Sequence, residues 1–446
     1  MFLKGKPVMN NNNYTSYHGG WTRKMWLNYN NKFIVMSIIV LIGVMPFVSG
    51  RPPVIPQKLV DNGRILYGPI YSKTTYLLNL DGTISHTWTG DYYPGEAVRW
   101  LGNGMIMRTI KTTINGFGGA GGGVQKVLWN GTVVWEYHCD TNGNISHHDI
   151  TILPNGDVLM IVWETKTKDQ AIAAGRDPST IPLDYFCPDK IIEVKPTGPT
   201  SGDVVWEWHS WDHMIQDYDA SKTNYENVAA HPELIDINYG GNEDWLHTNS
   251  IDYNAQFDQI LISVHNFNEI WIIDHSTTTA KAAGHTGGKS GHGGDLLYRW
   301  GNPQAYCQGG SSDEKLFWQH DASWIKEGCP GAGHILIFNN GANRPEKTKY
   351  STVEEIVPPV NSTGHYYYIP GTAYGPENTV WSYVATPPSS FFCAAFGSAE
   401  RLRDGTTLIC KSVGGEIFIV SPSGTTTWQQ SGISGTPWQA AYVRGN

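Results

Sequence analysis

The segment Asp149-Ile-Thr-Ile-Leu-Pro-Asn-Gly-Asp-Val-Leu-Met-Ile-Val162 places two apolar strands around a Pro-Asn-Gly turn. Apolar runs on either side of an Asn-Gly pair are a strong signal for a β-hairpin. Units of this kind recur along the chain, and the others begin near Val98, Ser250, Ala322 and Glu400. The recurrence predicts a repeated all-β architecture.

A second unit alternates with the first and ends in an aromatic strand. Its six copies contain Trp88, Trp135, Trp206, Trp300, Trp381 and Trp428. One hairpin unit and one aromatic unit together make a four-stranded antiparallel blade, and repetition of the pair predicts six blades. A six-bladed β-propeller explains this repeat better than the alternative, a β-sandwich with a second domain.

One blade is predicted to be divided between the two ends of residues 51–446. Residues 59–90 supply three strands, and Gln439–Asn446 supplies a first strand that has no successor. Pairing of this C-terminal strand with the N-terminal blade would close the ring and remove exposed sheet edges. Residues 51–446 are therefore predicted to be one propeller domain.

The composition agrees with an all-β chain. Of 446 residues, 16% are charged, and the chain has 50 glycines, 18 tryptophans and 23 tyrosines. A chain this rich in glycine and aromatic residues and this poor in charge is neither disordered nor a coiled coil. The net charge of −9, with no basic patch, argues against nucleic acid as a partner.

The first 50 residues differ from the rest and are predicted to be a basic leader. They contain five basic and no acidic residues, and an apolar run occupies residues 33–48. A basic lead, a short apolar core and a small-residue exit are typical of a signal peptide, with a retained membrane anchor as the alternative. We therefore expect export, either as a secreted or as a cell-surface protein. Residues 51–446 then have a net charge of −14.

All six cysteines follow the leader, and none belongs to a Cys-x-x-Cys pair. Zinc knuckles and thioredoxin-like chemistry therefore have no support. Because disulfides persist outside the cytosol, we predict a bridge between Cys307 and Cys329, with free buried thiols as the alternative.

Three histidines share one position in the repeat. His148, His247 and His320 each lie seven residues before a residue of the turn that follows the first strand of a blade. First strands line the central channel of a propeller, so these side chains should converge at one mouth of the channel. His265, at a second strand, adds to the group.

Clustered histidines fit three kinds of site. Imidazole binds transition metals, it serves in acid–base and nucleophilic catalysis, and it occurs in polar channels filled with water. The spacing alone leaves all three open. Asp149 and Asp321 follow two of the histidines and point to the opposite strand face, where we expect them to anchor backbone or a neighbouring blade.

Five segments carry a resemblance to a known family: His147–Gly156, Asp244–Tyr253, Glu269–Ser276, Leu297–Pro303 and Gln319–Trp324. Each resembles a motif of the aryl-sulfate sulfotransferases, and the resemblance covers nearly all of residues 60–446. It implies an exported six-bladed β-propeller that moves a sulfuryl group from a phenolic sulfate ester to an acceptor phenol. It also implies small-molecule partners, no cofactor or metal, and no use of the nucleotide sulfate donor PAPS.

The resemblance further implies a ping-pong mechanism through a sulfohistidine. By motif, His320 corresponds to the family nucleophile. His148 and His247 are then expected to stabilise the transferred group, and one of them or His265 to exchange a proton with the phenols. Arg299 corresponds to the family's catalytic arginine by order along the chain, although the blade pattern puts it on an outer strand, where an arginine usually faces solvent. At His265 the sequence departs from the Arg-His pair of the family.

Two other functions remain open. One is a non-catalytic exported propeller that acts as a binding or surface-structural module, which the departure at His265 favours. The other is a metal-dependent hydrolase that uses the same histidines. Residues 212–244 and 284–294 are predicted to be loops over one face. Residues 50–60 leave little room for the extra domain that family members use in dimer contacts, so no oligomeric state is predicted.

Overall fold

The computed structural model describes residues 25–29, 32–36, 63–113, 116–433 and 435–444, and the chain divides into two units, residues 1–51 and 52–446. In the first unit, β1 (Met25–Tyr29) and β2 (Lys32–Met36) pair as a two-stranded antiparallel sheet. Apart from residues 33–36, the apolar run of the predicted leader lies outside the described residues. Within the described part of the chain, no helix is long and apolar enough to cross a membrane.

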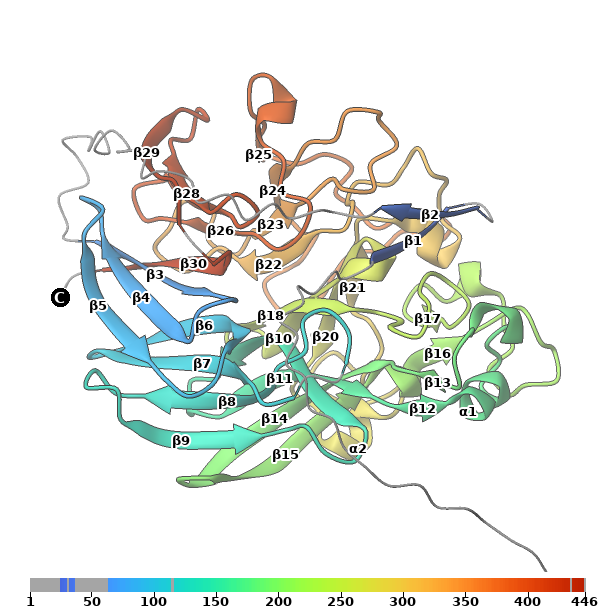
Figure 1. Cartoon of the computed structure of the whole chain (residues 1–446). Helices are drawn as coiled ribbons and strands as arrows, with labels where there is room; N and C mark the ends of the chain where they lie inside the picture. The colour runs from blue at the N-terminus through green and yellow to red at the C-terminus, as the bar shows by residue number, and fades with distance from the viewer. Residues whose placement is uncertain (1–24, 30–31, 37–62, 114–115, 434, 445–446) are drawn as a thin grey trace, which may run out of the picture. The chain divides into compact units, whose positions relative to one another are not determined.

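Six four-stranded antiparallel sheets make up the second unit and follow one another in a ring (Figure 1). From the innermost to the outermost strand, the first three blades are β30 (Pro437–Val443), β3 (Arg64–Pro69), β4 (Thr74–Asn79) and β5 (Ile84–Thr89); β6 (Pro94–Gly102), β7 (Met105–Lys111), β8 (Gly122–Val127) and β9 (Val133–His138); and β10 (Asn144–Ile152), β11 (Val158–Glu164), β14 (Asp189–Gly198) and β15 (Ser201–His209). The other three are β18 (Thr248–Asn254), β19 (Gln259–Val264), β20 (Glu269–Asp274) and β21 (Tyr298–Trp300); β22 (His320–Trp324), β23 (Ile335–Asn339), β24 (Thr352–Ile356) and β25 (Trp381–Tyr383); and β26 (Ser398–Arg401), β27 (Thr407–Lys411), β28 (Glu416–Val420) and β29 (Thr426–Gln430). The predicted six-bladed β-propeller is confirmed.

The first blade closes the ring. Its innermost strand, β30, pairs antiparallel with β3, with Val443 opposite Arg64 and Ala440 opposite Tyr67. The innermost strands of neighbouring blades also contact one another round the whole ring. The predicted closure is confirmed, and β30 begins two residues earlier than the predicted strand.

The core consists mainly of six clusters of apolar side chains, one between each pair of neighbouring blades. Between the first two blades, for example, Leu66 and Trp88 pack with Val98 and Val127. Both faces of each blade are apolar, so a blade buries its hydrophobic surface only when it stacks on two neighbours. This requirement explains why the repeat runs over the whole second unit.

One tryptophan of each outermost strand ties its blade to the next. Its indole N–H donates to a backbone carbonyl in the segment that leads into the outermost strand of the following blade, at 2.7–3.0 Å. The pairs are Trp88 with Leu128, Trp135 with Ser201, Trp208 with Gly294, Trp300 with Pro376, Trp381 with Pro422, and Trp428 with Leu80. The recurring aromatic strand therefore has one structural task in all six blades.

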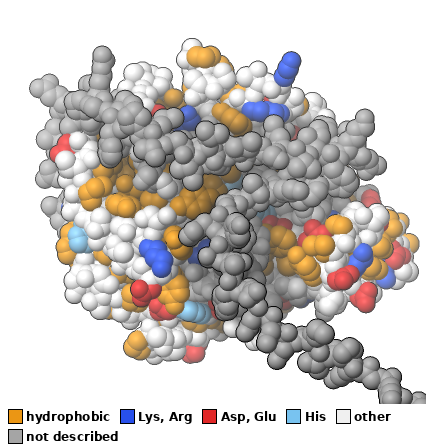
Figure 2. Space-filling view, viewed as in Figure 1, with side chains coloured by type: hydrophobic (Ala, Val, Ile, Leu, Met, Phe, Trp, Pro, Cys, Tyr) orange, Lys and Arg blue, Asp and Glu red, His pale blue; other side chains and the backbone are white. Residues whose placement is uncertain are grey.

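Several short elements lie between the blade strands. They are β12 (Lys166–Thr167), β13 (Tyr185–Phe186), β16 (Met214–Ile215), β17 (Ile235–Asp236), α1 (Lys168–Ala173), α2 (Thr279–Ala282) and the 3-10 helices η1 (Pro178–Thr180), η2 (Ser210–His213), η3 (Val228–Ala230), η4 (His265–Phe267), η5 (Pro303–Tyr306) and η6 (Pro388–Ser390). Most belong to the long connections within and after the third blade. Figure 2 shows acidic side chains among hydrophobic ones over the region of α1, β12 and β16.

The predicted disulfide between Cys307 and Cys329 is absent, and all six cysteines are free. Cys307 is exposed and follows η5, in the connection between the fourth and fifth blades. Cys329 lies between β22 and β23 and packs against the apolar cluster of Ile325 and Phe338. The two thiols therefore have separate surroundings, and spacing along the chain could not show this.

Candidate active site

The innermost strands are interrupted at the register position that the sequence singled out. β6, β10, β18 and β22 each contain a β-bulge or register shift there. Glu96, His148 and His247 have positive φ angles of 124°, 53° and 50°, and Asp321, next to His320, has 50°. Such backbone costs about 1–3 kcal/mol in a residue with a side chain, and bulges re-aim side chains near functional sites. The strain marks this position as more than a packing site.

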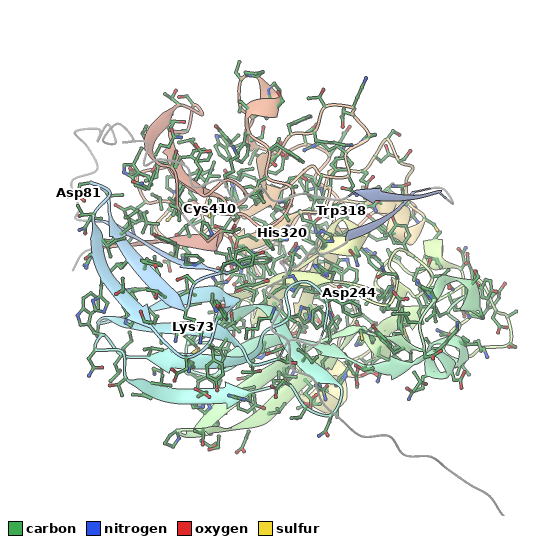
Figure 3. The ribbon with its side chains drawn as sticks, in the orientation of Figure 1. Lys73, Asp81, Asp244, Trp318, His320 and Cys410 are labelled. Carbon is green, nitrogen blue, oxygen red and sulfur yellow. The ribbon has the colours of Figure 1, made fainter. Side chains whose placement is uncertain are left out.

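The four predicted histidines form one chain of rings. Ring centroids lie 4.6 Å apart for His148 and His247, 4.9 Å for His247 and His265, and 5.5 Å for His265 and His320. Figure 3 labels His320 at the centre of the blades. The spacing of the repeat therefore located three of these residues, and the second-strand position of His265 added the fourth.

His320 is held in one tautomer. Its Nδ1 lies 2.8 Å from Oδ1 of Asn340 and 3.2 Å from the carbonyl of Trp318. Asn340 uses its amide N–H groups on the carbonyls of Cys393 and Phe396, so its oxygen must face the ring. Nδ1 therefore carries the proton and Nε2 the lone pair, to which the N–H of Phe396 donates at 3.3 Å. Burial lowers the pKa of His320 to about 4, so the ring is neutral near pH 7.

His247 differs from its neighbours because it has a carboxylate partner. Its Nδ1 hydrogen-bonds to Oδ2 of Asp244, whose Oδ1 accepts the indole N–H of Trp163 at 2.9 Å. Asn266 fixes the same segment by donating to the backbone carbonyl of Asp244 at 2.6 Å. Burial alone would lower the pKa of His247, but the charge of Asp244 outweighs it and the pKa is raised. His247 is therefore the ring best suited to carry a proton.

His148 is neutral and enclosed. Its Nδ1 lies 2.8 Å from Nδ1 of His147, and its Nε2 lies 3.9 Å from Oε2 of Glu96. Gly119 covers the ring so closely that a Cβ there would lie 2.0 Å from Cε1 of His148. Burial, and then the charge of His247, lowers the pKa of His148 well below its ordinary value. Oε2 of Glu96 has no hydrogen-bond partner among the described residues, and burial raises the pKa of Glu96 well above its usual range.

His265 links His247 to His320. It begins η4, directly after β19, and its Nδ1 lies 2.8 Å from Oδ1 of Asn266. Its ring stacks on Trp318, with centroids 5.4 Å apart. Burial, and then the charges of His247 and His320, lowers the pKa of His265 well below its ordinary value. A neutral ring in this place can offer or accept a hydrogen bond without adding charge.

Arg299 lies apart from the four rings. It is on the outer strand β21, as predicted, but it is fully buried and does not face solvent. Its guanidinium forms a two-pronged ion pair with Glu269 and donates to the carbonyls of Pro232 and Leu234. These bonds serve to hold the long connection before β18 against the fourth blade. The catalytic role stays a prediction, and the geometry favours a structural one.

The aspartates that follow two of the histidines join neighbouring blades, as predicted. Asp149 accepts the backbone N–H of Ile251 at 3.2 Å, and Asp321 accepts that of Ala399 at 2.9 Å. Arg99, on β6 of the second blade, also forms an ion pair with Asp149. Burial raises the pKa of Asp321 to about 7. The two faces of one strand thus separate the ring cluster from the inter-blade contacts.

Under the hypothesis of a metal-dependent hydrolase, a metal would bind the four histidines of the ring chain. We call these the channel histidines: His148, His247, His265 and His320. Among the described residues, the only three His, Cys, Asp or Glu ligand atoms that lie within 4.8 Å of one another belong to His213, His285 and Asp295. The four channel histidines do not form such a group.

Two further site residues were missed by the sequence reasoning. Asp244 lies three residues before His247, inside a motif already recognised. Asn340 follows β23 as His265 follows β19, so the same register could have located it. Restricting the search to histidines hid both. The register did give a third residue, Glu96, seven residues before Asn103, but no role was predicted for it.

A comparison with family models gives a family. The family model described as Arylsulfotransferase (ASST) matches residues 68–427. No curated protein matches the chain.

Among solved structures, a protein of unknown function from Bacteroides caccae is 12% identical, with a TM-score of 0.48, over 86% of this chain and 100% of that one. Virginiamycin B lyase from Staphylococcus aureus is 10% identical, with a TM-score of 0.39, over 85% and 87%. The periplasmic gluconolactonase of Pseudomonas aeruginosa is 9% identical, with a TM-score of 0.43, over 85% and 99%. These similarities carry no argument about function.

Proposed function

This chain belongs to the arylsulfotransferase family, and we propose that it moves a sulfuryl group from a phenolic sulfate ester to an acceptor phenol in two steps. The first step forms a sulfohistidine at His320, and the second transfers the group to the acceptor. PAPS takes no part. The observation that best supports this proposal is the geometry of the ring chain. Nε2 of His320 has its lone pair at one end of the chain, and His247, paired with Asp244, lies within it.

The fixed tautomer of His320 supports its role as the nucleophile. A neutral imidazole attacks through the nitrogen that lacks a proton, and here that nitrogen is Nε2. The low pKa keeps this lone pair available at neutral pH. After attack, the N–H of Phe396 is free to donate to an oxygen of the transferred group, because Nε2 no longer accepts it.

His247 is the proposed acid and base. The raised pKa favours a protonated ring, and Asp244 orients it as a carboxylate orients the histidine of a catalytic pair. The side chain of His247 is 19% exposed, so phenols reach it more easily than the enclosed His148. His148 and His265 remain neutral and are suited to hydrogen-bond the group or the phenols.

The two steps balance in atoms and protons. In the first, Nε2 of His320 attacks sulfur, the sulfur–oxygen bond of the ester breaks, and the departing phenolate takes the proton of His247. In the second, the acceptor phenol returns a proton to His247, its oxygen attacks sulfur, and the nitrogen–sulfur bond breaks. Both histidines return to their starting states, so no external oxidant, base or nucleotide is needed.

The site must attract a negatively charged group. The sulfuryl group carries negative charge on three oxygens, whereas residues 51–446 have a net charge of −14. Attraction must therefore come from nearby groups and not from the field of the whole molecule. Protonated His247, whose ring lies 4.6 Å from that of His148 and 4.9 Å from that of His265, supplies this attraction directly.

A two-substrate assay tests the proposal. 4-Nitrophenyl sulfate is the donor and a different phenol the acceptor, and initial rates are measured while each is varied. We expect parallel double-reciprocal lines, release of 4-nitrophenol and sulfate on the acceptor. PAPS as the only donor should give no product.

Other outcomes support the other functions. Absence of transfer with a panel of phenols favours a binding or surface-structural module. Release of inorganic sulfate without transfer, lost on chelation and restored by metal, favours a hydrolase. Intersecting lines contradict the two-step route, because both substrates would then be bound together.

We further propose that the protein is exported through its basic leader. The proposal rests on the apolar run at residues 33–48 after a lead without acidic residues. N-terminal sequencing of the protein from its natural host should show a new terminus near residue 50, or an intact leader in the membrane fraction if the leader is kept as an anchor. An intact leader on protein in the cytosolic fraction contradicts export.

A further inference from the structure

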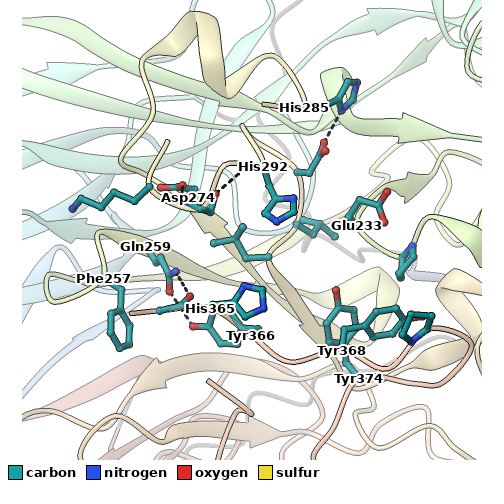
Figure 4. A pocket seen from close by; sticks show the side chains of 18 of the residues that line it. Glu233, Phe257, Gln259, Asp274, His285, His292, His365, Tyr366, Tyr368 and Tyr374 are labelled. Atoms are coloured by element: carbon teal, nitrogen blue, oxygen red, sulfur yellow. Dashed lines mark hydrogen bonds and ion pairs between the residues drawn. The ribbon is translucent and has the colours of Figure 1, made fainter. Parts of the chain in front are cut away.

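A second cluster of titratable side chains lies on the wall of a cavity of about 990 Å³ beside the fourth blade (Figure 4). His285 and Asp295 come from the glycine-rich connection between α2 and β21, and His213 ends η2, which follows the third blade. The contacts of these three side chains include none of the four channel histidines. The sulfuryl-transfer proposal leaves this cluster without a role.

Three electron-pair donors converge in the cluster. Oδ1 of Asp295 lies 2.8 Å from Nδ1 of His213 and 2.7 Å from Nδ1 of His285. The two imidazole rings are perpendicular, with centroids 5.8 Å apart. The dashed line in Figure 4 marks the contact of His285 with the carboxylate. Two nitrogens and one oxygen from two segments of the chain thus lie within 4.8 Å of one another.

The hydrogen bond of Nε2 of His213 shows which nitrogen of the ring can bind a metal ion. Nε2 lies 2.8 Å from the carbonyl oxygen of Ala282, which can only accept, so Nε2 carries a proton. Nδ1 is then the ring nitrogen that faces Oδ1 of Asp295 and is available to a metal ion. A metal-binding histidine typically donates its other N–H to a carbonyl in this way. His213 is fully buried, so its ring is held in one orientation by these contacts.

The surrounding residues hold this arrangement in place. The ring of His213 stacks on Trp208 at 5.7 Å, and the indole of Trp208 donates to the carbonyl of Gly294. A Cβ on Gly294 would lie 2.0 Å from the Ala282 carbonyl oxygen and 2.6 Å from Nε2 of His213, so only glycine fits. The tryptophan contact that joins the third blade to the fourth therefore also positions His213 and the residue before Asp295.

We propose that His213, His285 and Asp295 bind a divalent transition metal ion, for which Zn²⁺ is the best match. Two imidazoles and one carboxylate are a ligand set that zinc commonly takes, and three protein ligands leave a fourth position for water. Tetrahedral bonds of about 2.0 Å need ligand atoms ~3.3 Å apart. The side chain of His285 is 59% exposed and has room to make this small adjustment.

His285 and Asp295 line the cavity, so an ion bound by them would have a structural and a binding consequence. It ties the glycine-rich connection to η2, and it presents a positive charge to a cavity that also contains Tyr366, Tyr374 and His292. A water or an anionic oxygen of a ligand in the cavity completes the coordination. The proposal is independent of sulfuryl transfer, because its residues take no part in that reaction.

Metal binding to the untagged full-length protein tests the proposal. The protein is dialysed against a chelator and titrated with Zn²⁺ by calorimetry and with Co²⁺ by visible absorption. We expect one ion per chain, cobalt bands of tetrahedral intensity and a rise in Tm on addition of zinc, since a ligand that binds only the folded state stabilises it.

Variants assign the site. His285→Ala should weaken zinc binding by at least about tenfold and remove the cobalt bands, and because the residue is exposed the protein should still fold. Asp295→Asn should do the same. His292→Ala, on the same connection, is the matched control and should bind as the unaltered protein does. A wild-type chain that binds neither ion, or that binds equally well after His285→Ala, overturns the proposal. Loss of zinc with unchanged sulfuryl transfer leaves the proposed function intact.

Discussion

At the outer edge of every blade a tryptophan donates to a carbonyl of the next blade, whereas at the inner edge the equivalent residue is histidine in three blades and differs in the other three. The six inner positions are Glu96, His148, His247, His320, Gly397 and Gln439. None of the six outer tryptophans has a positive φ angle, whereas Glu96, His148 and His247 at the inner edge, and Asp321 beside His320, all do.

The difference separates two uses of one repeat. A residue that does the same thing in all blades maintains the ring, so its loss should lower stability and leave chemistry intact. A residue that breaks the repeat, in backbone that costs free energy, is placed for another purpose. Substitutions at the inner edge should therefore change activity more than stability, and those at the outer edge the reverse.

The largest effect is expected for His320→Ala. Removal of the nucleophile should lower kcat for transfer by more than about 10³-fold, because no other ring has a free nitrogen fixed in the same way. Tm should change little. Activity and thermal unfolding are measured together, with the exposed His138→Ala as the control. Unchanged transfer in His320→Ala would contradict the conclusion that inner-edge residues carry the chemistry.

Asp244→Asn should have the next largest effect. Loss of the carboxylate removes the interaction that raises the pKa of His247, and we expect kcat to fall by about 10²-fold or more. The pH profile gives the sharper test. In the unaltered protein kcat/KM should rise with pH through about 4, as His320 loses its proton, and fall above the raised pKa of His247. Asp244→Asn should move the alkaline limb to lower pH and leave the acid limb in place. An unmoved alkaline limb assigns the acid to another group.

Much of the fold and part of this site could be predicted from the sequence. Alternating strands with Asn-Gly turns gave the blades, and the seven-residue spacing gave His148, His247 and His320. These features depend only on residues that are close together in the sequence, so the sequence alone reveals them. The positive φ at His148 and His247, which aims the rings, depends on packing between blades and left no signal.

Non-local contacts account for what was missed. Arg299 was expected to face solvent, because nothing in its strand reveals that Pro232 and Leu234 cover it. The predicted bridge between Cys307 and Cys329 was wrong because the surroundings of each thiol are set by contacts between distant parts of the chain. Asn340 follows β23 as His265 follows β19, but it has no charge, and its contact with His320 is what shows its importance.

A moderate effect on stability is expected for Trp428→Phe at the outer edge. The change leaves the buried carbonyl of Leu80 without its donor and should lower the free energy of unfolding by about 1–3 kcal/mol. The kcat per folded molecule should not change. The exposed Trp129→Phe is the matched control and should alter stability by less than about 0.5 kcal/mol. A variant of Trp428 that keeps its stability but loses activity contradicts the division between the two edges.

The smallest effect is expected for Glu96→Gln. Burial raises the pKa of this carboxyl well above its usual range and so favours the uncharged form. An amide of the same shape should therefore change kcat by less than about threefold, or under about 0.7 kcal/mol. Steady-state rates across the pH range check this. A shifted limb in the pH profile would mean that Glu96 ionises during turnover and belongs with the acid–base groups.

The central claim is that the sulfuryl group passes through His320, and rapid-quench mass spectrometry tests it most directly. The protein is mixed with an aryl sulfate without acceptor, quenched, digested and mapped at neutral or alkaline pH. The account predicts one sulfuryl mass on the peptide that contains His320, which disappears when a phenol is added. A sulfuryl mass on another residue, or active turnover with no adduct at any time, would contradict it.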